Sequence, residues 1–185
     1  MQILKFKLLL CLSLFILSAQ ASPEKWETTV VEHANYSISF PGTPSPNFQQ
    51  VETELGTLDL NMLILDGSAI GDVNYLYLVN VTTYPSDRID SDNEETVEDF
   101  FIGIIEGAST NVDGELLSEE VITYKGYPGR EIKVEYYLED SEVALIQMRI
   151  YLVKNTTYML QCMSPIDNPG NKSVKKFMKS FKLLD

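Results

Sequence analysis

Histidine and cysteine, two residue types common in active sites, are scarce in this 185-residue chain. His33 is the only histidine, so zinc sites built on several histidines, the HExxH motif and multi-histidine iron sites are excluded. A Ser-His-Asp triad would have to use His33, and the sequence contains no G-x-S-x-G nucleophile elbow. A Cys-His pair would need Cys162 beside His33, and nothing in the pattern brings them together. No catalytic residue is therefore predicted.

Carboxylates are abundant, with 27 acidic residues against 14 lysines and arginines. Asp90-x-Asp92-x-Glu94 resembles the start of a calcium-binding EF-hand loop, but Glu95 stands where that loop needs glycine. Phe101 stands at the twelfth place, which needs a bidentate glutamate. No metal site is predicted, because acids at the start of a helix explain the run. A carboxylate-based hydrolase stays open as an alternative, since it needs only two carboxyl groups about 5–9.5 Å apart.

Cofactor and disulfide signals are also absent from the sequence. Neither G-x-G-x-x-G nor G-x-x-x-x-G-K occurs, so no phosphate-binding loop and no cofactor are expected. Of the two cysteines, Cys11 lies in an apolar N-terminal stretch, and Cys162 alternates with Tyr158 and Leu160 in a strand-like run. This pattern predicts that Cys162 is a buried thiol that behaves as a small hydrophobic residue.

The formal net charge of −13 disfavours nucleic acid as a partner, because phosphate recognition needs a locally positive surface. Five lysines nevertheless fall within the last 14 positions. They are typical of an amphipathic helix with lysines facing water or its own acidic body; the alternative is a basic patch for anionic lipid or an acidic partner. Two arginines and a tyrosine are further candidate anchors, although the arginines could instead pair with Glu131 or Glu135. The candidate partner-binding residues are Tyr127, Arg130, Arg149, Lys172, Lys175, Lys176 and Lys179.

The first 21 residues have the pattern of a secretory signal peptide. Two lysines form a positive n-region, ten apolar residues follow, and Ala19-Gln20-Ala21 is a cleavage site. The apolar stretch is half of the roughly 20 residues that a membrane-spanning helix needs, so cleavage before Ser22 is expected. The predicted organisation is a cleaved leader, residues 1–21, and a single globular domain, residues 22–185, that is soluble and periplasmic or secreted. Membrane contact is expected to be peripheral at most.

Hydrophobic periodicity predicts a domain built mostly of strands. Two stretches have the helical period instead, with apolar stripes over 97–105 and 174–181, and the second is expected to begin at an Asn168 cap. The turn Tyr127-Pro128-Gly129-Arg130 is predicted to be type II. Tight turns make consecutive strands antiparallel, and both helices are expected to bury their apolar faces on the sheet, which gives an α+β layered domain. The predicted strands are 36–40, 48–54, 57–65, 75–84, 116–124, 131–138, 142–154 and 158–163.

Four segments share features with a known family: Trp26, Tyr36-Ser-Ile-Ser-Phe-Pro-Gly-Thr-Pro44, Gly126-Tyr-Pro-Gly-Arg-Glu131 and the closing residues 177–183. Together they resemble exported bacterial proteins of the PsbP/Mog-like superfamily. The resemblance covers most of residues 26–183 and implies an antiparallel sheet flanked by helices on both faces, an α/β/α arrangement. A helix-grip or lipocalin-like fold, with the sheet curved around a lipid pocket, is the alternative architecture.

The functional content of this resemblance is an analogy of fold. PsbP proteins support the oxygen-evolving side of photosystem II and Mog proteins bind the Ran GTPase, but the interaction residues of neither family match positions here. The resemblance favours an exported, soluble, non-catalytic binding or accessory protein, whose partner is an unknown protein or small ligand. The alternatives are a peripheral envelope protein whose C-terminal lysine helix meets anionic lipid, and the carboxylate-based hydrolase.

Overall fold

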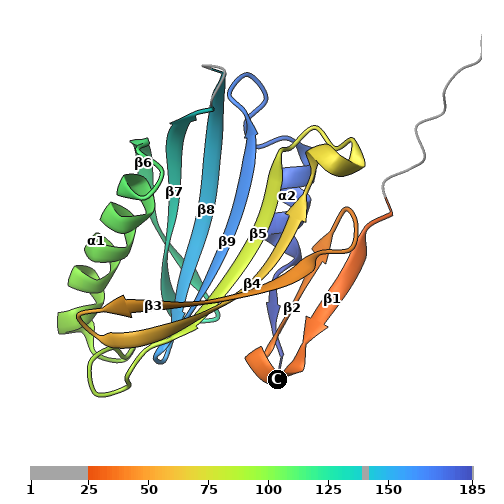
Figure 1. Cartoon of the computed structure of the whole chain (residues 1–185). Helices are drawn as coiled ribbons and strands as arrows, with labels where there is room; N and C mark the ends of the chain where they lie inside the picture. The colour runs from red at the N-terminus through yellow and green to blue at the C-terminus, as the bar shows by residue number, and fades with distance from the viewer. Residues whose placement is uncertain (1–24, 139–141, 185) are drawn as a thin grey trace, which may run out of the picture.

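The computed structural model describes residues 25–138 and 142–184 (Figure 1). The predicted leader, residues 1–21, lies outside the described residues. Strands dominate the described part, as the periodicity predicts. The strands are β1 (Glu27–Val31), β2 (Tyr36–Phe40), β3 (Ser45–Thr53), β4 (Gly56–Asp66), β5 (Leu76–Thr83), β6 (Glu115–Tyr124), β7 (Tyr127–Tyr137), β8 (Val143–Val153), β9 (Thr156–Pro165) and β10 (Lys182–Leu183), and the helices are α1 (Glu94–Thr110) and α2 (Lys172–Ser180).

Seven strands form the central sheet, in the order β3-β4-β5-β9-β8-β7-β6, and every neighbouring pair is antiparallel (Figure 1). The sheet consists of two meanders, β3 to β5 and β6 to β9, which join side by side where β5 pairs with β9. Helix α1 connects the two meanders in sequence. The β5–β9 pair therefore lies in the interior of the sheet, and β3 and β6 form its edges.

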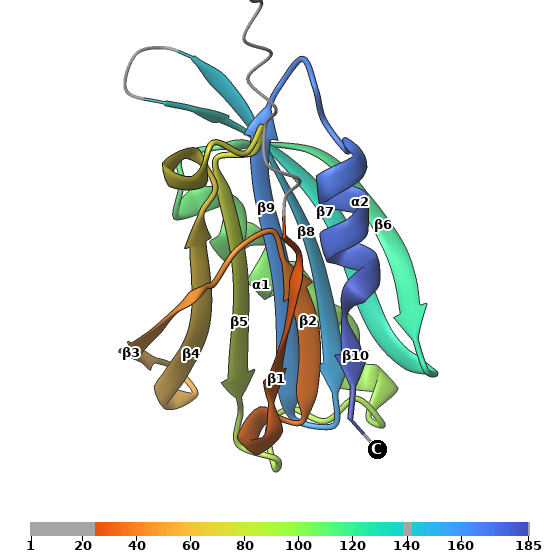
Figure 2. The same cartoon turned by 90° about the vertical axis from the view of Figure 1, so that its right-hand side faces the viewer.

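The two faces of the central sheet carry different layers (Figure 2). Helix α1 packs on one face, where its Phe101 joins a buried cluster that includes Ile150 of β8. Helix α2 and a small sheet, β1-β2-β10, pack on the other face, where Phe177 and Tyr151 belong to a second buried cluster. Ile150 and Tyr151 are neighbours in β8 and so point to opposite faces. Because both faces are covered at its centre, β8 is apolar at most positions.

The prediction of an α+β domain with an antiparallel sheet is confirmed. An α/β/α arrangement implies a layer of helices on each face of the sheet. In the described residues each face carries a single helix, so the two covering layers are less helical than expected. On the face under α2, the three strands of the small sheet share the covering with that helix. The second layer is therefore mixed rather than purely helical.

The predicted type II turn at Pro128-Gly129 is wrong. Tyr124 pairs with Tyr127 at the end of the β6–β7 ladder, so the hairpin turns at Lys125-Gly126. These two residues have φ values of +51° and +89°. Two consecutive positive φ angles are typical of the type I′ turn, whose twist matches that of the strands.

The predicted cap of the second helix is also wrong, by three residues. Helix α2 begins at Lys172, and Asn171 rather than Asn168 is its N-cap. The Asn171 Oδ1 accepts the backbone N–H groups of Ser173 and Val174, each at 3.1 Å. Both asparagines are favourable cap residues by type, so residue type alone does not distinguish them.

Candidate functional site

Three of the seven candidate partner-binding residues lie together in an open cleft between α2 and the central sheet. Arg149 of β8 and Lys175 and Lys179 of α2 line this cleft, whose volume is about 410 Å³. Lys133 of β7 adds a fourth cation, and Glu131 is the one acid among the lining residues. We call it the basic cleft and define it by Glu131, Lys133, Gln147, Arg149, Pro169, Gly170, Lys175 and Lys179.

The register of β7 and β8 builds the floor of the basic cleft. Glu131 pairs with Arg149, and Lys133 pairs with Gln147, so all four side chains share one face of the sheet. The Arg149 Nε lies 2.5 Å from the Glu131 Oε2, and the Gln147 Nε2 donates to the Glu131 Oε1 at 3.0 Å. Burial raises the pKa of the neighbouring Tyr151 phenol, and the charge of Arg149 opposes that rise. Arg149 is thus held in place by its neighbours, with 27% of its side chain exposed.

Helix α2 forms the wall of the basic cleft. Its apolar residues Val174, Phe177 and Met178 are buried, which leaves its lysines on the solvent side. Lys175 and Lys179 are four residues apart and therefore lie on the same side of the helix. Phe177 fixes the helix on the sheet through ring contacts with Phe40 at 5.3 Å and Tyr77 at 5.2 Å, measured between centroids.

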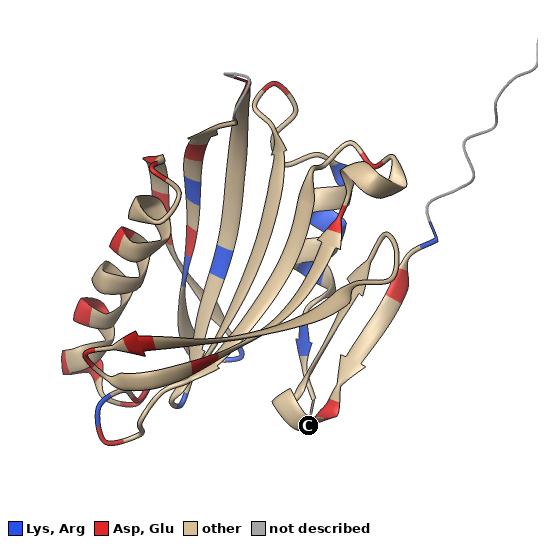
Figure 3. Cartoon of the chain, in the orientation of Figure 1, with Lys and Arg blue, Asp and Glu red and all other residues tan. Residues whose placement is uncertain are grey.

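The charge of the basic cleft is opposite to that of the chain. Four cationic side chains face one carboxylate there, whereas the chain as a whole has a formal charge of −13. Figure 3 shows acidic residues along α1 and basic residues on α2 and β8, whereas β7 carries residues of both signs. Within residues 25–138 and 142–184, Lys133, Lys175 and Lys179 form no ion pair. These lysines are available to a carboxylate or phosphate group, and the buried Gln147 Oε1, which has no partner, could accept a donor from the same ligand.

Two other predicted lysines lie on α2 outside the basic cleft. Lys176 stacks on the ring of Trp26, with its Nζ 4.3 Å from the ring centroid. This cation–π contact connects α2 to the segment before β1. Lys172 is the first residue of the helix and is exposed.

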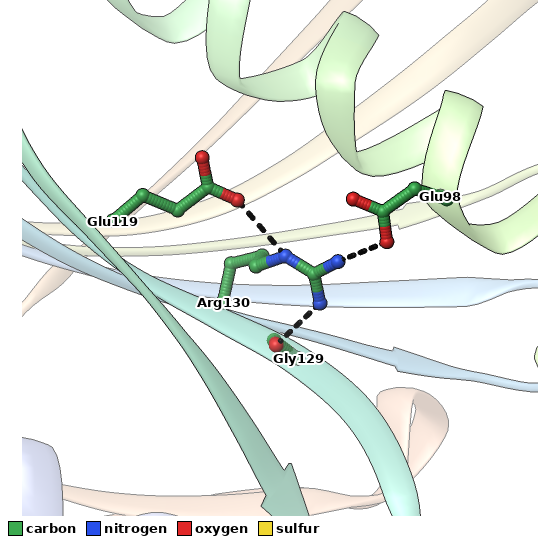
Figure 4. Close-up of polar contacts among 4 residues, drawn as sticks. All are labelled: Glu98, Glu119, Gly129 and Arg130. Carbon is green, nitrogen blue, oxygen red and sulfur yellow. Dashed lines mark hydrogen bonds and ion pairs between the residues drawn. The ribbon is translucent and has the colours of Figure 1, made fainter.

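Arg130 lies on the opposite face of the sheet, under α1 (Figure 4). It is 4% exposed, and its guanidinium pairs with Glu98 of α1 and, at 3.0 Å, with Glu119 of β6. It also donates to the Gly129 carbonyl at 3.1 Å and lies 4.5 Å from the centroid of the Phe101 ring. These contacts leave no guanidinium surface for a partner, so Arg130 connects α1 to the sheet and does not join Arg149.

Tyr127 is likewise separate from the basic cleft. It is the first residue of β7 and pairs with Tyr124 across the hairpin. Three residues of β7 lie between it and the Glu131–Arg149 pair.

Sequence reasoning missed two residues of the basic cleft, Lys133 and Gln147. The alternation of Glu131, Lys133 and Glu135 with apolar residues marks one polar face of β7. That signal places the three side chains on one face, but it does not show that α2 packs beside them.

Cys162 and His33, the two residues considered for nucleophilic catalysis, lie in β9 and in the turn between β1 and β2. Cys162 is fully buried, as predicted, and burial raises the pKa of its thiol well above the ordinary value. His33 lies in the short 3-10 turn between β1 and β2. Among the described residues, no three His, Cys, Asp or Glu side chains are grouped so that they could hold a metal ion.

Comparison with known proteins supports the fold. No family model matches the chain, and no curated protein sequence matches it. Among solved structures, the chain is similar to cyanobacterial PsbP (CyanoP) from Synechocystis sp. PCC 6803, with a TM-score of 0.51 and 11% identity over 89% of this chain and 95% of that one. At this identity the likeness shows the fold alone, and it confirms the resemblance to the PsbP superfamily at the level of fold.

Two further solved structures are similar to the chain with TM-scores below 0.5. A protein of unknown function from Pseudomonas aeruginosa has a TM-score of 0.40 and 9% identity over 77% of this chain and 84% of that one. A protein from Bacteroides thetaiotaomicron has a TM-score of 0.45 and 10% identity over 85% of this chain and 48% of that one.

Neither helix in the described part of the chain has the length and apolar character that spanning a membrane requires.

Proposed function

We propose that the protein is an exported, soluble, non-catalytic binding or accessory protein that engages its partner through the basic cleft. The observation that carries the proposal is the gathering of four cations around one carboxylate on a strongly acidic chain. Such a local reversal of charge attracts an anionic group, while the acidic remainder of the surface repels other anionic molecules. The partner is thus a protein or small ligand that presents a carboxylate or phosphate.

The construction of the basic cleft supports binding rather than accidental charge. Strands β7 and β8 of the central sheet form its floor. Helix α2, which buried aromatic contacts hold on the sheet, forms its wall. Rigid elements hold binding groups in place better than loops do. Arg149 is further oriented by Glu131, so its guanidinium presents a defined edge to a bound anion.

The test compares two double variants that remove the same charge from the same segment. Lys175→Gln with Lys179→Gln removes two cations of the basic cleft, and Lys172→Gln with Lys182→Gln removes two exposed cations outside it. The probe is a labelled peptide of ten glutamates, titrated at low salt and followed by fluorescence anisotropy. If an exposed ion pair contributes about 0.3–0.7 kcal/mol, the cleft variant should bind about three- to tenfold more weakly than the wild type. Equal losses in the two variants would contradict a role for the cleft.

The second candidate is a peripheral envelope protein, favoured by the row of exposed lysines on α2. Because the apolar face of α2 is buried in the core, the helix could meet lipid only through its lysines. Binding would then be electrostatic and would disappear at high salt. Co-sedimentation with vesicles containing anionic lipid tests this, and both double variants should lose binding equally if the whole lysine row is used.

For the hydrolase hypothesis, Glu54 in the β3–β4 turn and Asp99 of α1 are a candidate acid pair, because both line the same pocket. Turnover of a glycoside that is abolished by either Glu54→Gln or Asp99→Asn would favour it over binding.

Export is tested separately, by sequencing the N-terminus of the protein recovered from outside the cytoplasm. A mature start at Ser22 is expected, and retention of residues 1–21 in the cytoplasm would refute export.

A further inference from the structure

The face of the central sheet that carries α1 is only partly covered. Seven strands about 4.8 Å apart make a sheet about 29 Å wide, whereas a helix is about 10 Å across. Figure 1 shows α1 on the β6 side of the sheet, and we call the part of this face formed by β4, β5 and β9 the open part. Side chains on this open part are apolar yet only partly buried, and they include Leu60, Met62, Leu78 and Met159. An apolar sheet surface left half-exposed is a signal of a ligand or partner.

A groove runs along α1 over this open surface. Two adjoining pockets of about 620 and 380 Å³ form it, and they share Tyr84 and Ile104. The larger pocket lies towards the β3–β4 turn and Phe100, and the smaller one lies over the middle of β4, β5 and β9. We call this the α1 groove. Its dimensions fall in the range of about 300–1,000 Å³ that small-molecule sites occupy.

Asn80 lies on the floor of the smaller pocket and has an unused acceptor. Its Nδ2 donates to the Thr82 Oγ1 at 3.2 Å, but its Oδ1 is buried without a hydrogen-bond partner. The cross-strand neighbours of Asn80 on this face are Met62 of β4 and Met159 of β9. An unpaired buried carbonyl is unfavourable unless a donor reaches it, and methionine side chains are flexible enough to move aside.

The charges around the α1 groove define the class of ligand. No charged residue is among those that line the smaller pocket. The larger pocket is lined by Glu54 and Asp99, with Arg88 as its one cation. A carboxylate in the smaller pocket would find no cationic partner among the described lining residues, and the two acids of the adjoining pocket would repel it. An uncharged ligand fits this lining, and an anionic amphiphile does not.

Two glycines of α1 keep the groove open. Gly103 lines the larger pocket and Gly107 the smaller one. A methyl group placed on either residue would meet nothing within 4 Å, so no close packing requires glycine there. Glycine weakens the interior of a helix, and a larger residue at either position would occupy the groove.

We propose that the α1 groove binds an uncharged amphiphile whose head carries a hydroxyl or amide N–H group. The apolar part lies on Leu60, Met62 and Met159, and the head donates a hydrogen bond to the Asn80 Oδ1 once a methionine has moved aside. This site goes beyond the proposed function, because it is on the opposite face of the sheet from the basic cleft.

Three ligands with the same ten-carbon chain test the proposal: decan-1-ol, decyl methyl ether and decanoate. Binding is followed through the methionine methyl signals in NMR spectra, which report directly on Met62 and Met159. One neutral hydrogen bond should make decan-1-ol bind about three- to tenfold more tightly than the ether, and decanoate should bind most weakly. In Asn80→Leu the preference for the alcohol over the ether should vanish while the ether still binds.

A second variant tests the location of the site. Gly107→Phe places a ring in open space and should abolish binding of all three ligands. Its matched control is Ile102→Phe on the exposed side of α1, which should leave binding unchanged. If Gly107→Phe does not give the native far-UV circular dichroism spectrum, Gly107→Leu replaces it.

Several results would overturn the proposal. Decanoate binding as tightly as decan-1-ol would refute an uncharged ligand, and a preference for the alcohol that persists in Asn80→Leu would refute the hydrogen bond. Binding that survives Gly107→Phe, or no binding by any of the three ligands, would refute the site. The ten-glutamate peptide should bind all groove variants as it binds the wild type, so failure here is separable from failure of the basic cleft.

Discussion

Because the guanidinium of Arg130 is buried, we expect that removing its two acidic partners lowers the free energy of unfolding more than removing the arginine itself. Its side chain is 4% exposed, whereas the side chains of Glu98 and Glu119 are 64% and 40% exposed. Removing both acids, as Glu98→Ala with Glu119→Ala, leaves a buried cation with the Gly129 carbonyl and the Phe101 ring as its remaining neighbours. Removing the cation, as Arg130→Met, leaves two carboxylates that water already reaches.

The magnitudes follow from this difference in exposure. Leaving one partner of a buried ion pair uncompensated costs about 3–5 kcal/mol, and we expect about 3 kcal/mol for the double variant because its acids lie at the edge of the site. Arg130→Met loses charge-assisted hydrogen bonds but keeps apolar contact with Phe101, so we expect about 1–2 kcal/mol. The triple variant removes all three charges and should therefore be about 1–2 kcal/mol more stable than the double variant.

The assay is urea unfolding followed by far-UV circular dichroism, with the free energy of unfolding of each variant taken from linear extrapolation. The sign of one difference decides the outcome. If adding Arg130→Met to the double variant lowers stability further, the guanidinium is not an uncompensated buried charge. The Arg130 side chain would then stabilise the contact between α1 and the sheet even without its two carboxylates.

Three further predictions concern single sites. Phe177→Ala should lower the free energy of unfolding by about 3–5 kcal/mol in urea, because the ring is fully buried in the cluster under α2. Gly129→Ala should lower the free energy of unfolding by about 2 kcal/mol, because its Cβ would lie 2.7 Å from the Ile150 carbonyl oxygen. Its control, Gly103→Ala, should raise that free energy by about 0.5–1 kcal/mol, because the added methyl group meets open space in a helix. A hydrogen bond from Lys154, together with its charge, lowers the pKa of the Asp92 carboxyl below 3.8, so NMR titration of Lys154→Met should find that pKa raised. The stabilisation from this pair is present above the unfolded-state pKa of Asp92 and is lost as the pH falls through the folded-state value.

The elements of this fold were predictable where the signal is local. The apolar stripe of α1 marks the residues that the structure buries, with Phe101 and Ile105 the deepest. The mixed face of β8 indicates a second layer, and the structure places α2 and the small sheet there. Both signals depend only on the spacing of apolar residues along one segment.

The site required information that spacing does not contain. Arg130 pairs with Glu98, 32 positions away, rather than with Glu131 or Glu135, because neighbours in one strand point to opposite faces. Lys133 joins the basic cleft only because α2 packs beside β7, a contact between segments about 40 positions apart. Turn chemistry was misread for a similar reason: Lys125 adopts a positive φ, which its residue type disfavours and the hairpin register imposes.

The pairing of β2 has a consequence for the order in which the molecule can fold. One edge of β2 pairs with β1 and the other with β10, where Leu183 lies opposite Tyr36. The small sheet therefore cannot be completed until residues 182–183 reach β2, and Phe40 lacks its ring contact with Phe177 until α2 is in place. A contact across about 145 positions of sequence closes slowly, so we expect this layer to form late in folding.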